Sequence, residues 1–69
     1  MKISARNILA GRIRSINKGA TTSHVQIELA GGPVVTSSIT NEAVTDLGLK
    51  VGDKAYAVIK ASDVMVGKD

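Results

Sequence analysis

The clearest pattern along the chain is a strict alternation of apolar and polar residues from His24 to Leu29. Successive side chains of a strand point to opposite faces, so a period of two predicts an antiparallel strand with one buried face. Gly31-Gly32 predicts a tight hairpin turn after this strand. The β-branched run from Val34 to Ile39 is the expected returning strand.

An earlier segment, Ile8 to Ile16, predicts the first strand, although its alternation is imperfect. Ile13 and Ile16 are three residues apart, so a regular strand would place them on opposite faces. A bend or bulge near Gly11 would reconcile the two positions.

The apolar period changes between Thr40 and Leu49, where it fits one or two turns of helix. Thr40 or Asn41 is suited to the N-cap position, because a short polar side chain can accept a hydrogen bond from the first helical turn. Gly48 is suited to end the helix in the left-handed conformation.

The remaining segments predict two more strands, Lys54 to Ala61 and the short Asp63 to Val66. Three strands, a short helix and two further strands predict an all-β fold, a five-stranded OB-fold Greek-key barrel with the helix between strands three and four. Since no repeat, linker or low-complexity segment interrupts the order, we expect residues 1–69 to form a single domain.

The chain has 69 residues, no cysteine and one histidine. A domain this short buries only about 60% of the surface that its unfolded chain exposes. Disulfides and thiolate sites are excluded, and a metal site with several histidines is excluded within one chain. We therefore expect association with further copies to supply stability.

The N-terminal stretch MKISARN carries a polar or charged residue at every second or third step. This is the pattern of neither a signal peptide nor a membrane span. We expect a cytoplasmic location and no membrane partner.

Nine Lys and Arg residues against six Asp and Glu residues give a net charge of +3, which suits an anionic partner. Tyr56 is the only aromatic residue. Proteins that bind single-stranded nucleic acid stack the bases on several aromatic side chains. The composition therefore favours a small anion over nucleic acid.

We find no catalytic constellation. Ser23 and His24 are neighbours on a predicted strand, so they point to opposite faces and cannot act as a nucleophile and base. Phosphate-binding and dinucleotide-binding glycine motifs are missing. The sequence predicts that the protein is not an enzyme.

Several residues could hold an anion. Ser4 and Arg6 offer a hydroxyl and a guanidinium close together, and Lys60 lies in an otherwise apolar strand. Thr40 offers a hydroxyl at a helix start, where we expect the N–H groups of residues 42 and 43 to be free. Each also has a structural explanation: an N-terminal arm, a lysine that extends to water, and a helix cap.

These residues lie in motifs that resemble the molbindins, small cytoplasmic proteins made of a single molybdate-binding TOBE (or Mop) domain. The resemblance runs nearly end to end and is most specific in two motifs, Ser4-Ala5-Arg6-Asn7 and Ile59-Lys60-Ala61 followed by Val64-Met65. Weaker matches are Gly11, Gly19-Ala20, Leu29-Ala30-Gly31-Gly32, Ile39-Thr40 and Leu47-Gly48-Leu49-Lys50 with Gly52.

The resemblance implies an OB-type barrel, a homohexamer built as a trimer of dimers, and molybdate or tungstate bound between subunits for molybdenum storage. It implies that no protein group bonds the metal directly, and that the oxyanion is held by Ser4, Arg6 and Lys60 of one chain and by Thr40 of the neighbouring chain. Ala43 and Ala61 complete the expected ligand set. Some related domains have serine at position 43, so Ala43 would act through its backbone N–H. Whether Arg6 acts through its side chain or backbone stays open.

The chemistry of molybdate fits such a site. The dianion has four acceptor oxygens and no proton at neutral pH, so donors alone satisfy it. Phosphate, partly protonated, would need an acceptor in the wall, whereas sulfate differs mainly in size.

Two other interpretations remain open. The chain could be a nucleic-acid-binding OB domain, or a structural oligomerisation module without a working anion site. Equilibrium dialysis with molybdate distinguishes anion binding from both.

Overall fold

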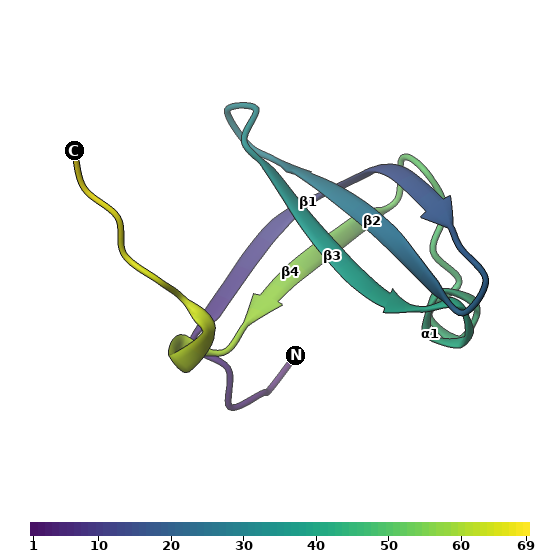
Figure 1. Ribbon diagram of the computed structural model, residues 1–69, viewed down its shortest axis with the longest axis horizontal. Coiled ribbons are helices and arrows are strands. Elements are labelled where there is room, and N and C mark those ends of the chain that lie inside the picture. The colour runs from purple at the N-terminus through teal and green to yellow at the C-terminus, as the bar shows by residue number, and fades with distance from the viewer.

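The computed structural model describes residues 1–69, which form a curled antiparallel sheet of four strands in the order β3-β2-β1-β4 (Figure 1). The strands are β1 (Asn7–Lys18), β2 (Thr22–Leu29), β3 (Val34–Thr40) and β4 (Lys54–Ile59). Helix α1 (Asn41–Leu47) connects β3 to β4, and a 3₁₀ turn, η1 (Ala61–Asp63), follows β4. The first four predicted strands and the helix are confirmed, with ends that differ by up to two residues.

Strand β1, with 12 residues, is the longest strand of the sheet, and each half of it pairs with a different neighbour. Its first half pairs with β4, from Asn7 opposite Ile59 to Arg12 opposite Lys54. Its second half pairs with β2, ending with Lys18 opposite Ser23. The two ladders overlap only around Gly11 and Arg12, so the sheet is offset along β1.

The irregularity predicted near Gly11 is present a few residues later. The register of β1 against β2 shifts between Ile13 and Ser15. This extra residue lets Ile13, which is 2% exposed, and the half-buried Ile16 face the same side of the sheet.

The core is small. Its four buried apolar residues come from β1, β2 and β4 and are Ile13, Val25, Ile27 and Ala57. Partly buried residues surround them, including Ile39 of β3, Val44 of α1 and Leu49. Only five of the 69 residues are buried, so the chain gains little from apolar burial on its own.

Both ends of α1 follow the local signals in the sequence. Thr40 is the N-cap, and its side chain accepts a hydrogen bond from the Ala43 N–H. Gly48 ends the helix in the left-handed conformation, with φ of 62°, and donates to the Thr45 carbonyl oxygen.

The predicted fifth strand, Asp63 to Val66, is wrong. Hydrogen bonds from the Asp63 N–H to the Lys60 oxygen (2.9 Å) and from the Val64 N–H to the Ala61 oxygen (3.3 Å) form η1 instead. The chain then continues away from the sheet (Figure 1). A strand forms only where its backbone pairs with a neighbouring strand. Residues 63–66 pair with neither edge strand, so the outer edges of β3 and β4 both remain unpaired. The expected barrel is therefore open within one chain.

Neither α1 nor η1 has the length and apolar character that a membrane-crossing helix requires.

The close contact of β1 with β2 generates a first prediction. A Cβ atom on Gly11 would lie 2.5 Å from the Glu28 carbonyl oxygen and 2.8 Å from Ile27 Cγ2, so the strands would have to separate. We expect Gly11→Ala to lower the free energy of unfolding by about 1–3 kcal/mol in urea titrations. Gly67→Ala, where a Cβ meets only open space, is the control and should change it by less than about 0.5 kcal/mol. Equal stability of the two variants would show that the strands do not pack this closely.

Candidate functional site

Four of the predicted ligand residues lie at one end of the sheet. Two precede β1 and two follow β4: Ser4, Arg6, Lys60 and Ala61. The β1–β4 ladder holds these segments side by side, because Asn7 pairs with Ile59 (Figure 1). Asn7 Nδ2 also donates a hydrogen bond of 3.2 Å to the Ile59 carbonyl oxygen. We call this group the arm cluster.

The arm cluster is exposed and rich in hydrogen-bond donors. Ser4 carries a hydroxyl, while the Arg6 guanidinium and the Lys60 ammonium are donors that always carry a positive charge at neutral pH. Ala61 has no polar side chain, so only its backbone can contact an anion. Two cations and a hydroxyl can neutralise a dianion and bond to part of its surface.

Thr40 and Ala43 belong to the start of α1. Helix α1 lies at the opposite end of the sheet (Figure 1). Thr40 pairs with Thr22 on β2, next to the Ser23–Lys18 pair that ends the β1 ladder. We call Thr40 and Ala43 the cap pair.

The distance between the arm cluster and the cap pair decides how they can act. A strand advances about 3.3 Å per residue, so the path along β1 from Asn7 to Lys18 measures up to about 36 Å. Hydrogen bonds need donor–acceptor distances of about 3 Å. The strand pairing places the cap pair and the arm cluster at opposite ends of β1, too far apart to contact the same anion within one chain.

The local geometry corrects one expectation about the helix start. The Ala43 N–H, expected to be free, already donates to Thr40 Oγ1 at 3.0 Å. Because this contact uses the Thr40 oxygen as an acceptor, the hydroxyl proton of Thr40 remains available for donation to a ligand. Thr40 is thus the stronger donor of the pair, and Ala43 orients it.

A polar network that the sequence analysis missed anchors the cap pair. Ser23, only 1% exposed, lies with its Oγ 2.6 Å from Asn41 Oδ1. The Asn41 side chain donates to the Gly19 carbonyl oxygen at 2.9 Å, and its backbone N–H donates to the Thr21 oxygen at 2.9 Å. These bonds tie the helix start to the β1–β2 turn. The signal in the sequence was Ser23 itself, which continues the inward period of Val25 and Ile27.

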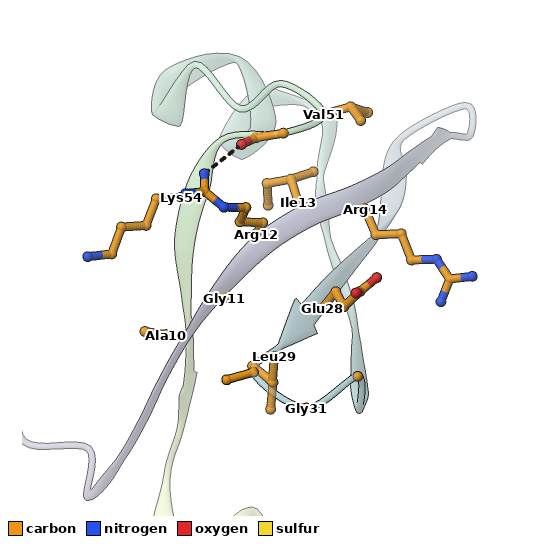
Figure 2. A pocket seen from close by; sticks show the side chains of 13 residues that line it. Ala10, Gly11, Arg12, Ile13, Arg14, Glu28, Leu29, Gly31, Val51 and Lys54 are labelled. Atoms are coloured by element: carbon orange, nitrogen blue, oxygen red, sulfur yellow. Dashed lines mark hydrogen bonds between the residues drawn. The ribbon is translucent and has the colours of Figure 1, made fainter.

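The largest hollow lies elsewhere, between β1, the β2–β3 hairpin and the turn before β4 (Figure 2). None of the predicted ligand residues lines it. Arg12 donates to the Gly52 carbonyl oxygen at 3.2 Å, while Arg14 and Lys54 point away on opposite sides (Figure 2). The Glu28 carboxylate is also present. Divergent cations beside a carboxylate do not form a cage for a dianion.

The Thr40 cap generates a second prediction, made without any anion present. Thr40→Ala removes the acceptor for the Ala43 N–H and should lower the free energy of unfolding by about 1 kcal/mol. Thr40→Ser keeps the hydroxyl and should remain within about 0.5 kcal/mol of the unsubstituted protein. Urea denaturation followed by circular dichroism measures both. A Thr40→Ala variant as stable as Thr40→Ser would exclude a capping role.

Comparison with known proteins identifies the family. Residues 3–66 match the family model described as the TOBE domain. The chain is 51% identical over 67 residues to a probable molybdenum-pterin-binding protein of Haemophilus influenzae, and the match covers 97% of each. It is 48% identical over 66 residues to molybdenum-pterin-binding protein 3 of Clostridium pasteurianum, covering 96% of this chain and 97% of that protein.

Solved structures agree. MopII from Clostridium pasteurianum, in an apo form, superimposes with a TM-score of 0.91 at 43% identity, covering 97% of this chain and all of that one. The cytoplasmic molybdate-binding protein ModG, with molybdate bound, gives a TM-score of 0.91 at 51% identity, covering 94% of this chain and 46% of that chain.

These names describe binding proteins, and the matches extend over nearly the whole chain. The family model, the sequence relatives and the solved structures therefore agree: the chain belongs to the TOBE-domain family, among its small, molbindin-type members.

Proposed function

We propose that the chain binds the molybdate dianion at a site shared between two copies, with the arm cluster of one copy and the cap pair of the other surrounding the anion. The observation that carries the proposal is the separation of these two groups to opposite ends of the sheet. Each end alone is incomplete, because it offers only a few donors on an exposed surface.

The arm cluster would supply the positive charge. Arg6 and Lys60 bring two cations to an anion of two negative charges, and hydrogen bonds between ionised partners are about twice as strong as neutral ones. Ser4 adds a neutral donor. Burial between two copies would strengthen these contacts, because the effective dielectric constant falls when water is excluded.

The cap pair would complete the donor set from the second copy. Thr40 Oγ1 accepts the bond from the Ala43 N–H, so its hydroxyl proton would be free to donate to the anion. Ala43 would contact the anion only by sharing its N–H, and Ala61 would contribute through its backbone. All of these groups donate, as an unprotonated tetrahedral oxyanion requires.

The proposal extends from the anion site to the assembly and its role in the cell. We propose that residues 1–69 act as one binding unit in a homohexamer, a trimer of dimers, that stores molybdenum in the cytoplasm without catalysing a reaction. Tungstate, which has the same charge and tetrahedral shape, is expected to bind at the same place. ModG, which superimposes closely, is described as cytoplasmic and was solved with molybdate bound.

Nucleic acid is not part of the proposal. Tyr56 is the only aromatic residue, and the Lys54 ammonium already lies over its ring, 5.6 Å from the centroid. A run of stacked bases has no platform on this surface.

The proposal is tested by titrating the anion-free protein with inorganic molybdate in a calorimeter. We expect saturable binding of molybdate and tungstate, and much weaker binding of sulfate and phosphate at equal ionic strength. Because no pterin is added, the experiment also shows whether the inorganic anion suffices. No heat change with molybdate, together with no retention in equilibrium dialysis, would contradict the proposal.

The role of Lys60 gives the third prediction. Lys60→Ala should weaken molybdate binding by about 2–5 kcal/mol, since it leaves a buried anion without one of its charged partners. Lys2→Ala removes the same charge from an exposed residue outside the arm cluster and is the matched control; we expect a change of less than about 1 kcal/mol there. If both variants lose the same small amount of binding free energy, Lys60 does not contact the anion and attracts it only by long-range electrostatics.

A further inference from the structure

The chain has three asparagines, and two of them lie directly beside residues of the proposed anion site. Asn7 follows Arg6, and Asn41 follows Thr40. Both are half-buried and donate hydrogen bonds from their side-chain amides. The third asparagine, Asn17, is exposed, has no proposed ligand as its neighbour and makes no side-chain hydrogen bond.

Asn7 joins the two segments of the arm cluster. It forms the last pair of the β1–β4 ladder with Ile59, so Arg6 comes directly before the ladder and Lys60 directly after it. Asn7 Nδ2 donates to the Ile59 carbonyl oxygen at 3.2 Å and thereby links residues that are 52 positions apart. Chain segments at the end of a ladder open easily. The bond therefore limits how far the backbones that carry the two cations can separate.

Asn41 holds the other half of the site through both ends of its amide. Its Nδ2 donates to the Gly19 carbonyl oxygen at 2.9 Å, and its Oδ1 accepts from the Ser23 hydroxyl at 2.6 Å. A reversed amide would bring two oxygens together at Gly19, so the two partners fix its orientation. Ser23 is 1% exposed, and a buried hydroxyl needs a partner. That partner is the amide next to Thr40.

The β1–β2 turn gives Asn41 a rigid support. The Gly19 N–H donates to the Thr22 carbonyl oxygen at 2.8 Å, and a Cβ atom on Gly19 would lie 2.9 Å from that oxygen. The backbone N–H of Asn41 donates to the Thr21 carbonyl oxygen at 2.9 Å. Both the backbone and the side chain of Asn41 are therefore bound to this tight turn. The neighbouring Thr40, although exposed, is held in place relative to the sheet.

We propose that Asn7 and Asn41 are positioning residues for anion binding, one in each half of the shared site. Both act through the ligands beside them and not by contact with the anion, since their amides are bonded within the chain. Asn7 fixes the spacing of the two cations of the arm cluster, and Asn41 fixes the hydroxyl of Thr40. Groups that are held in place before binding lose less conformational entropy when the anion arrives. The inference rests on the proposed function, because it concerns the same site.

The first test is titration of Asn7→Ala and Asn41→Ala with inorganic molybdate in a calorimeter, beside Asn17→Ala as the matched control. Each of the first two should raise the dissociation constant about 10-fold or more, as is usual when an outer partner that orients a ligand is removed. Asn17→Ala should stay within about twofold, because the side chain is exposed and unbonded. Urea titrations show that each variant is folded under the binding conditions. Asn7→Ser and Asn41→Ser, whose side chains are too short for the same bonds, replace an alanine variant that does not fold.

Double substitutions separate positioning from a general loss of structure. Asn7→Ala should weaken binding much less in a Lys60→Ala chain than in a Thr40→Val chain. Asn41→Ala should show the reverse order. The reason is that substitutions within one unit are not additive, whereas those at distant, independent sites are. A substitution that only destabilises the protein would weaken binding by the same factor in both backgrounds.

Three results would overturn the proposal. Asn7→Ala and Asn41→Ala could bind molybdate as tightly as Asn17→Ala, which would leave the proposed function intact but give the asparagines no part in it. Equal losses in the two double-substitution backgrounds would show that they act only on general stability. If the unsubstituted protein does not bind molybdate, the proposed function fails and this inference fails with it.

Discussion

The pairing of β1 with two different neighbours is the constraint on which the rest of the structure depends. The β4 ladder occupies one half of β1 and the β2 ladder occupies the other, and they overlap around Gly11, which lies opposite both Leu29 and Ala55. A glycine is required there because a side chain would meet the backbone of β2. The offset sends the arm cluster to one end of the sheet and the cap pair to the other.

The same offset leaves the chain incomplete in two respects. The core holds only four buried apolar residues, and it is not covered on the side between β3 and β4. The donors proposed for the anion are divided between two ends that no single chain can join. In our proposal a second copy completes the anion site, so assembly, stability and anion binding are expected to depend on one another.

Features encoded by a few adjacent residues were predictable from the sequence. The alternation from His24 to Leu29 gave β2, and Thr40 and Gly48 gave both ends of α1, because strand faces and helix caps depend on short-range geometry. The bulge in β1 was also predictable, since Ile13 and Ile16 had to reach the same side.

Features that depend on distant pairing were not predictable. The apolar residues from Val64 to Val66 suited a strand, but a strand also needs an edge to pair with, and this segment pairs with none in the chain. The Ser23–Asn41 contact requires the β2–β3 register, which brings two residues that are 18 positions apart together. Family resemblance supplied the candidate ligand residues and assigned Thr40 to a neighbouring chain, and the fold adds that the two groups lie at opposite ends of the sheet.

The central claim is that each anion site takes Lys60 from one copy and Thr40 from another. The most direct measurement refolds Lys60→Ala chains together with Thr40→Val chains and titrates the mixture with molybdate. In a mixed pair, one site carries both substitutions and the other carries neither. The account predicts tight sites in the mixture that neither variant shows alone. A mixture that demonstrably co-assembles but recovers no tight site would contradict the claim.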